Sequence, residues 1–378
     1  MERYNGQPLR PKPHLAVLFY DSIGDFVVIT PLLRGLHEKY PGCTLDYFSG
    51  ERTRELEEAC PYIDSRFSVF GADDSLRRVM GYIEERERLA GPYDLAINCD
   101  FHTALSAVTT MLRPRYAVGN CYNPDPRSDM PYPPNKVHNI HKEIWSSEDF
   151  LPRYSDILQS NYIAEIFCRL AWVETDFHRT EVPTAPPPFE PPPVLVSMGG
   201  KRPAKMWPTT HWERFIGWCT DQGLEVGLLG DKPAAQQQHY HSADAEGYLL
   251  RETALQDLRG TMTLPQVAGA LRRARACVTI DNGIMHLAIG VGTPTLALFG
   301  ASPWRLWTPQ APHLEVVLPE TPCSLCQEHV FKNEECLRSD HVCMETITPA
   351  AVSSRLAALL SRQAQAGSVS STEETEAV

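Results

Sequence analysis

The feature that most constrains the fold is a proline-rich segment, EVPTAPPPFEPPP, at residues 181–193. Seven of its thirteen residues are proline, which fixes φ and removes backbone donors, so the segment stays extended and cannot form a core. It divides a chain of 378 residues, which is long enough for two or three domains. We therefore expect an N-terminal domain over 1–180, a linker over 181–193, a C-terminal domain over 194–362 and a disordered Ser-, Thr- and Glu-rich tail over 363–378.

On each side of this segment, short apolar runs alternate with helical patterns. Before it, strands are expected at 14–22, 44–50 and 93–100, and helices at 26–41, 51–60 and about 104–112. After it, strands are expected at 194–200, 224–231, 276–281 and 294–300, and helices at 211–222, at 263–274 with Thr263 as N-cap, and between the last two strands. This order predicts an α/β protein with two doubly wound, Rossmann-like parallel sheets.

Charge and hydropathy exclude several classes of protein. The net charge is −12 and the pI is about 5.6, which argues against a nucleic-acid partner because such partners call for a basic face. No window approaches 18 uncharged apolar residues, so no transmembrane segment is expected. The N-terminal sequence MERYNGQPLRPKP lacks the apolar core of a signal peptide, and we expect a cytoplasmic protein.

The first candidate site follows the first expected strand, in the sequence DSIGDFVVITP. Gly24 allows a tight turn, and Asp25 lies at or just before the first turn of the next helix. On these residues alone an N-cap is the favoured interpretation of Asp25, because aspartate commonly holds that position. The alternative is a carboxylate that faces a cleft between the domains and serves as a general base.

The second candidate site is SMGGKRPAKMWP, after the first strand of the second pattern. Gly199 and Gly200 let the backbone approach a ligand closely. Lys201, Arg202 and Lys205 then present positive charge just before a helix, which suits a phosphate. An exposed basic loop is the alternative. Neither GxxxxGK[ST] nor GxGxxG is present, which excludes a P-loop and a standard dinucleotide site.

The third candidate site is CVTIDNGIMHLAIG, in which an apolar run gives way to a polar cluster and a second apolar run. Asp281 ends a strand, Gly283 permits a close turn, and His286 lies in the first turn of the helix that follows. The N–H groups and the positive dipole end of that helix, with one histidine and an upstream lysine, suit a diphosphate. In the alternative interpretation, Asp281 and Asn282 are only caps and His286 is a half-buried helix residue.

The eleven cysteines fall into two groups. Seven are scattered and are expected to be reduced thiols. Cys323, Cys326, Cys336 and Cys343 form a C-x2-C-x9-C-x6-C pattern that is similar to a tetrahedral Zn or Fe site. Four ligands would leave no open position for water, so such an ion would be structural. A loop of reduced cysteines is the alternative.

Together these motifs resemble glycosyltransferase family 9, the ADP-heptose heptosyltransferases. The resemblance covers about residues 14–360. It includes GD-x4-TP, formed by 24–31, and K-x-WP-x3-W, formed by 205–212. The most specific match lies within 258–309, which resembles the family's G-x3-L…D-[ST]-G-x-MH-L-A…P…LFG block. The C-x2-C…C…C-M-x2-I-x-P-x2-V ending is also shared by many members.

The resemblance implies a GT-B fold, in which two Rossmann-like domains face each other across a cleft that holds the active site. The N-terminal domain would bind the acceptor and the C-terminal domain an ADP-sugar, most often ADP-heptose. Transfer would be inverting and would need no catalytic metal. By position, Asp25 corresponds to the general base, Lys205 and His286 to diphosphate contacts, Asp281 to a contact with sugar hydroxyls and Met262 to the adenine-contacting segment. Gly200, Lys201, Asn282 and Gly283 complete the expected donor site.

Two departures from the family pattern concern the donor. Asn282 stands where most members have Ser or Thr, and Gly200-Lys201 stand where some members carry hydroxyl residues, so the transferred sugar is open to difference. For the acceptor we favour a small or soluble molecule over the lipopolysaccharide core or a protein. In the polar loop 123–145 of the acceptor half, we interpret His138 and His141 as ordinary surface histidines rather than acceptor contacts.

Two other classes of function remain at this stage. A nucleotide-sugar epimerase of GT-B type would need no separate acceptor and would act on the donor alone. A catalytically silent assembly protein would be organised by the cysteine cluster, but the joint presence of Asp25, Lys205, Asp281 and His286 argues against it.

Overall fold

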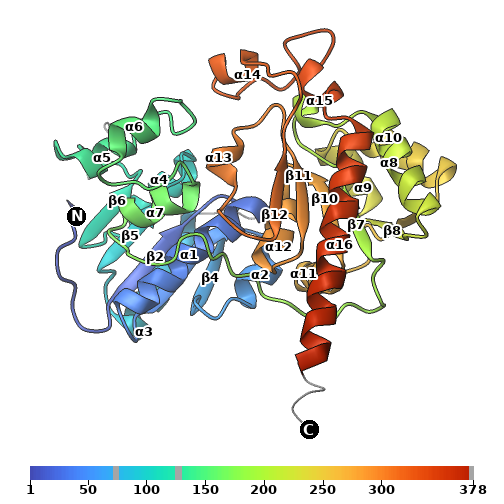
Figure 1. Cartoon of the computed structure of the whole chain (residues 1–378). Coiled ribbons are helices and arrows are strands. Elements are labelled where there is room, and N and C mark those ends of the chain that lie inside the picture. Colours follow the sequence, from blue (N-terminus) through green and yellow to red (C-terminus); the bar gives the residue numbers. More distant parts are fainter. Residues whose placement is uncertain (71–75, 124–129, 374–378) are drawn as a thin grey trace. The chain divides into compact units, whose positions relative to one another are not determined.

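The computed structural model describes residues 1–70, 76–123 and 130–373. The chain divides into two compact units. The first comprises Met1–Pro183 with Arg305–Pro309, and the second comprises Thr184–Trp304 with Gln310–Val378. The division falls inside the proline-rich segment, and each unit is built on its own sheet, as labelled in Figure 1.

In the sheet of the first unit, the described strands all pair in parallel. The strand that opens the β-α-β pattern lies in the middle, and the chain winds outward from it in both directions, which is the doubly wound arrangement. In spatial order the strands are β1 (Glu2–Arg3), β6 (Tyr116–Gly119), β5 (Leu95–Asn98), β2 (His14–Leu18), β3 (Thr44–Gly50) and β4 (Ser65–Phe70).

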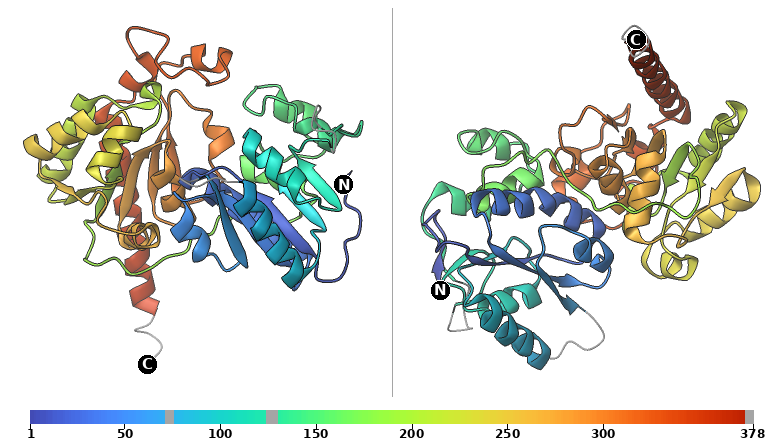
Figure 2. Two further views of the ribbon diagram at one scale, coloured as in Figure 1. Left: turned by 180° about the vertical axis from the view of Figure 1, so that it is seen from behind. Right: turned by 90° about the horizontal axis from the view of Figure 1, so that it is seen from below.

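Helices cover both faces of this first sheet. On one face, Val79, Ile83, Leu105 and Val108 pack with Ala16 and other apolar strand residues in one buried core. Helix α1 lies on the opposite face from α3, as the right-hand view of Figure 2 shows, and α1 packs against α7. The helices are α1 (Ile23–Lys39), α2 (Arg54–Glu58), α3 (Leu76–Ala90), α4 (Thr103–Met111), α5 (Lys136–Ile140), α6 (Phe150–Tyr154) and α7 (Ile163–Leu170).

The sheet of the second unit has the same arrangement of strands as the first. Its described strands are again all parallel, and the first strand of the pattern is again central. In spatial order they are β12 (Leu314–Val317), β11 (Thr295–Leu298), β10 (Ala276–Ile280), β7 (Val194–Ser197), β8 (Val226–Leu228) and β9 (Leu255–Asp257). This order is that of the dinucleotide-binding Rossmann fold.

The core of the second unit joins the sheet to helices α8 and α16. Trp212 and Phe215 of α8 are buried with Val196, Val278 and Leu356 in one cluster. The helical elements are η1 (Pro203–Lys205), α8 (Thr209–Asp221), α9 (Pro233–His239), α10 (Ala243–Glu252), α11 (Leu264–Arg273), α12 (Gly283–Gly290), α14 (Leu325–Glu328), α15 (Val342–Glu345) and α16 (Pro349–Glu373). Helix α13 (Trp304–Trp307) begins at the last residue before Arg305–Pro309, the short segment that belongs to the first unit.

The two-sheet α/β architecture that was predicted from the sequence is confirmed, and some of its details hold to the residue. Strand β3 occupies 44–50 as expected. Thr263 is the N-cap of α11, where its hydroxyl accepts from the N–H of Gln266 at 3.4 Å and the Gln266 side chain accepts from the N–H of Thr263 at 3.0 Å. This reciprocal pair is a capping box.

The tail over 363–378 that the sequence predicts to be disordered overlaps the end of helix α16, and its disorder stays a prediction. Helix α16 begins at Pro349 and continues to Glu373. Its early turns are anchored by buried Val352, Leu356 and Leu359, and the alanines and glutamines beyond them favour continued helix. Residues 374–378 lie outside the described part of the chain. Among the described residues, none of the helices is both long and apolar enough to cross a membrane.

Candidate functional site

The strand orders identify one point in each sheet where a ligand is expected. In doubly wound sheets, ligands bind beyond the carboxyl ends of the strands, at the point where the winding reverses. That point lies between β2 and β5 in the first sheet and between β7 and β10 in the second. We call the loops after β2 and β5 the first edge, and the loops after β7 and β10 the second edge.

The second edge joins Lys205 and Asp281. The Lys205 Nζ lies 2.6 Å from the Asp281 Oδ2, although the two residues are 76 positions apart. Lys205 is in η1, on the loop after β7, and Asp281 directly follows β10. The Lys205 side chain stays 21% exposed while that of Asp281 is only 7% exposed, so the cation is the member of the pair that a ligand from solvent can meet.

Two anchors hold the Lys205 loop in place. The buried Trp207 donates its indole N–H to the Ile347 carbonyl at 2.7 Å. Arg202 donates from Nε to the Asn333 carbonyl at 2.8 Å and from Nη1 to the Ala301 carbonyl at 3.0 Å. The positions of Lys205 and its ammonium group are therefore determined by contacts far away in the sequence.

Burial and charge set the protonation states at the second edge. Burial lowers the pKa of His286 to about 4, with the nearby Lys205 charge acting in the same direction and Asp281 opposing it. Burial alone would raise the pKa of Asp281, but the charge and hydrogen bond of Lys205 contribute most to outweighing it, so this pKa lies below its ordinary value. At neutral pH the edge therefore presents a neutral imidazole beside an ionised carboxylate.

Asn282 is the N-cap of helix α12. Its Oδ1 accepts from the Met285 N–H at 3.2 Å. Its Nδ2 donates to the Ser197 Oγ at 3.1 Å and to the Gly199 carbonyl at 3.0 Å. One side chain thus starts the helix and ties it to the glycine loop after β7, and the positive end of the α12 dipole lies at this edge.

The remaining residues of the predicted donor site lie on the same loops or next to them. Gly200 is on the loop after β7, where an added Cβ would come within 3.1 Å of the Ile280 side chain. Lys201 follows it and is exposed. Gly283 opens helix α12. Met262 is partly buried and lies after β9, just before the N-cap of α11. The structure places all of them at carboxyl ends of strands in the second unit.

At the first edge, Asp25 occupies the first turn of α1, and the N-cap is Ser22. The Ser22 hydroxyl donates to the Asp25 Oδ2, and the Asp25 N–H donates back to the Ser22 Oγ at 3.4 Å. Asp25 is partly exposed. The capping function that the sequence indicated therefore belongs to Ser22, and Asp25 supports it as the third helical residue.

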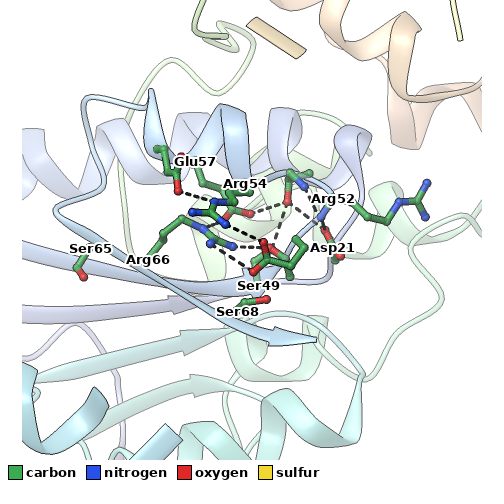
Figure 3. A network of polar contacts seen from close by, with 12 residues as sticks. Asp21, Ser49, Arg52, Arg54, Glu57, Ser65, Arg66 and Ser68 are labelled. Carbon is green, nitrogen blue, oxygen red and sulfur yellow. Dashed lines mark hydrogen bonds and ion pairs between the residues drawn. The ribbon is translucent and has the colours of Figure 1, made fainter. Parts of the chain in front are cut away.

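Asp21 fixes the loop that carries Asp25, and sequence reasoning missed it. Its buried Oδ1 accepts from the N–H groups of Arg52 at 2.8 Å and Thr53 at 3.2 Å, which links the loop after β2 to the loop after β3 (Figure 3). The network continues through the Thr53 hydroxyl to buried Glu57, and Arg66 donates to Glu57 at 2.7 Å. The carboxylate directly before the SIGD turn was the available signal.

The interpretation of His138 and His141 as surface histidines is wrong. Both are buried, with exposed fractions of 2% and 4%. His141 packs between the rings of Phe101 and Tyr132, with ring centroids 5.4 Å away in each case. Burial lowers the pKa of each histidine to about 4. In the surrounding loop, residues 124–129 lie outside the described part of the chain.

The structure does not support a metal site at the four clustered cysteines. Cys326 and Cys343 are buried, whereas Cys323 and Cys336 are partly exposed. Burial raises the pKa of Cys343 to about 11, and the other three thiols add to this increase. Within the described residues, no three Cys, His, Asp or Glu side chains are grouped so that they could hold a metal ion. All eleven cysteines are free thiols.

Comparisons with known proteins point in one direction. The model of a family described as glycosyltransferase family 9 (heptosyltransferase) matches residues 89–337. Lipopolysaccharide heptosyltransferase 2 of Escherichia coli (strain K12) is 25% identical over 356 residues, which cover 89% of this chain and 96% of that protein.

Solved structures show the same fold at low identity. The glycosyl transferase family 9 structure from Veillonella parvula DSM 2008 superposes with a TM-score of 0.73 at 16% identity, covering 95% of this chain and 100% of that one. The dodecameric iron-containing heptosyltransferase TibC in complex with ADP-D-beta-D-heptose gives a TM-score of 0.60 at 15% identity, covering 95% and 80%. The GT-B fold follows from these likenesses.

Proposed function

Because the chain belongs to glycosyltransferase family 9, the heptosyltransferase family, we propose that it is an inverting glycosyltransferase that moves a heptose or a related sugar from an ADP-activated donor. The acceptor would be a hydroxyl or amine of a small or soluble molecule. The complex of TibC with ADP-D-beta-D-heptose supports an ADP-sugar donor. The net charge of −12 supports a soluble acceptor over a strongly anionic glycolipid.

The observation that carries the proposal is the second edge. An ammonium group held by Asp281, a neutral imidazole and the N-terminus of an eight-residue helix belong to the loops after two adjacent parallel strands. A diphosphate needs donors and positive potential from several directions. Lys205, His286 and the first turn of α12 provide both, and Gly199 and Gly200 allow the backbone to come close.

In this mechanism the second edge stabilises the leaving group. As the bond between the anomeric carbon and the phosphate oxygen breaks, negative charge grows on the departing ADP. Lys205 neutralises part of that charge, and the α12 dipole and the neutral His286 ring supply further donors. Asp281 holds Lys205 in position and would hold the hydroxyls of the sugar.

Asp25 would remove the proton of the acceptor. The acceptor oxygen or nitrogen attacks the anomeric carbon from the face opposite ADP, its proton passes to the Asp25 carboxylate, and the configuration inverts. The Ser22 hydroxyl, which donates to Asp25 Oδ2, would orient that carboxylate.

A donor panel tests this proposal. The purified protein is heated with ADP, ADP-heptose or UDP-sugars, all at one concentration, which is about one hundred times the dissociation constant of ADP. At that concentration ADP stabilises the protein by about 2.7 kcal/mol. ADP and ADP-heptose should raise the melting temperature by several degrees, and UDP-sugars should not. A shift with UDP-sugars and none with ADP-sugars would overturn the assignment of the donor.

A variant locates the binding site. Lys205→Met should lose most of the stabilisation by ADP-heptose, because it removes the ammonium group that Asp281 holds at the second edge. Lys332→Met removes an exposed lysine of the same unit and serves as the matched control. Equal shifts in the two variants would place the donor elsewhere.

A further inference from the structure

Aromatic rings gather at the first edge and beside it. Tyr20 follows β2, His102 follows β5 and Phe70 ends β4. The Tyr20 and His102 rings stack with an interplanar angle of 19° and a centroid distance of 5.7 Å. Phe70 meets both of them edge-on, at 5.4 Å from Tyr20 and 4.6 Å from His102. Three different strands therefore contribute one ring each to a single cluster.

Phe101 precedes His102 in the chain and belongs to a second group of rings, with His141 and Trp145. Its side chain is 66% exposed although it stacks on the buried His141, with an interplanar angle of 15°. Trp145 lies beside both rings, with centroids 6.1 Å from Phe101 and 6.4 Å from His141. One face of the Phe101 ring thus packs on His141, while most of the side chain remains accessible to solvent.

The surface is rigid because a carboxylate ties its loops together. Asp100 accepts from the His102 N–H at 2.7 Å, and it also accepts a backbone hydrogen bond from Tyr20. His102 in turn accepts from the Ala104 N–H through Nδ1 at 3.2 Å and so caps helix α4. The backbone at Tyr20 and His102 is therefore held by Asp100, the His102 ring by the Ala104 N–H, and the Tyr20 ring by its contacts with His102 and Phe70.

The charges at this edge disfavour an anionic partner. Its loops and the adjoining loop after β3 carry the carboxylates of Asp21, Asp25, Glu51 and Asp100, and the aromatic faces themselves carry negative quadrupole potential. Over the described loop residues 19–25, 51–53, 99–102 and 120–123, Arg52 is the single Lys or Arg. Two further cations, Arg3 and Lys142, lie over the Tyr132 ring beside His141, and the Arg3 guanidinium is engaged by the backbone carbonyls of Gly119, Met130 and Pro131. A phosphorylated or carboxylated acceptor would call for several paired cations. A neutral ring with an apolar face would not.

We propose that Tyr20, His102 and Phe101 form the platform on which the acceptor lies, and that the acceptor presents an uncharged sugar ring to it. The weakly positive C–H face of a pyranose would stack on the rings, while a hydroxyl at its edge meets the Asp25 carboxylate, which follows Tyr20 closely in the chain. This inference rests on the proposed function, because it assigns the acceptor of the same transfer.

The test measures acceptor binding apart from donor binding. Methyl pyranosides of neutral hexoses and their 6-phosphates are added to the protein with ADP, and saturation-transfer NMR records which sugar protons lie against the protein. We expect transfer to the C–H protons of one face of at least one neutral pyranoside. We also expect Phe101→Ala to weaken that binding by at least about fivefold, and Phe101→Tyr, which keeps the ring, to restore it.

Leu89→Ala is the matched control, because Leu89 is 61% exposed in the same unit but carries no ring. The inference is overturned if no neutral pyranoside shows transfer, if the 6-phosphates bind more tightly, or if Phe101→Ala behaves like Leu89→Ala. Thermal stabilisation by ADP is measured on the same samples. Its absence in the wild type would count against the proposed donor site, and its presence with unaltered pyranoside binding in Phe101→Ala would count against the platform alone.

Discussion

Each edge lies at the same point of a doubly wound sheet of parallel strands, yet the two edges carry charge of opposite sign. The second edge has a lysine paired with a buried aspartate, close-packed glycines and a helix N-terminus. The first edge has carboxylates and a group of aromatic rings. The comparison teaches that the doubly wound sheet fixes where a ligand binds, while a few loop side chains decide whether it is a diphosphate or a neutral ring.

The largest expected effect separates chemistry from binding. Asp25→Asn should lower the transfer rate by roughly 10²–10⁴-fold, the range for loss of a general base, while ADP binding at the second edge stays unchanged. Rates and ADP dissociation constants are measured together, with the exposed Asp221→Asn as control. Transfer that persists in Asp25→Asn with ADP bound would mean that the base has been assigned wrongly.

Acid stability compares one buried histidine from each unit. The pKa of His141 and that of His286 are both lowered to about 4, from about 6.5 in an unfolded chain. Between these values the unfolded state binds more protons, so the free energy of unfolding falls as the pH falls from about 6.5 to about 4. The loss should be on the order of 3 kcal/mol for each residue.

Single variants, measured with and without ADP, show how much of this loss of unfolding free energy comes from each histidine. His141→Phe and His286→Gln should each flatten the dependence of unfolding free energy on pH in urea titrations. ADP should reduce the effect of His286, because a diphosphate favours the imidazolium form, and should leave the effect of His141 unchanged. Pairs of wild-type and variant curves that run parallel across this pH range would contradict the neutral state of the two buried imidazoles.

Substitutions in the Lys205–Asp281 pair should have a smaller effect, on ADP affinity, and the double variant serves as the control. Lys205→Met should weaken ADP binding by about 10- to 100-fold, the worth of a charge-assisted contact, and should also destabilise the fold because it leaves a buried carboxylate unpaired. Adding Asp281→Asn should restore much of the melting temperature but not the affinity for ADP, which titration calorimetry measures. Recovery of affinity in the double variant would show that Lys205 acts only through the fold.

The smallest effect concerns Asn282, the residue that departs from the family pattern. Asn282→Ser keeps an N-cap but loses the amide contacts to Ser197 and Gly199, so we expect a loss of about 1 kcal/mol in unfolding free energy. The preference among ADP-sugars should not change, since the side chain bonds within the protein. A switch of the preferred sugar would show that Asn282 selects the donor.

Local sequence patterns predicted the helices and strands. They did not predict contacts between loops that come together only because their strands are neighbours in a sheet. The alternation of apolar runs predicted β3, and the residue type at 263 predicted the N-cap of α11, because both depend on neighbouring residues. Asp21 contacts Arg52 and Thr53 only because β3 pairs with β2. The stack of Tyr20 on His102 likewise depends on the pairing of β2 with β5, which periodicity does not reveal.

The predictions for the candidate site also differ in how far they depend on contacts that the fold creates. Lys205, Asp281 and His286 were predicted from a motif resemblance, and the structure brings them together. The cysteine spacing predicted a metal site that the structure does not support, because spacing within a long loop does not determine how its thiols lie. His141 was misjudged because Phe101, the ring it stacks on, comes from a segment about forty residues earlier in the chain.

The contrast between the two edges can be tested most directly by amide hydrogen exchange, measured by mass spectrometry with and without saturating ADP. We predict that ADP slows exchange in peptides covering 199–205 and 281–287 and leaves exchange in peptides covering 19–25 and 99–102 unchanged. Protection confined to the first edge, or none at the N-terminus of α12, would contradict the assignment of the donor diphosphate to the second edge.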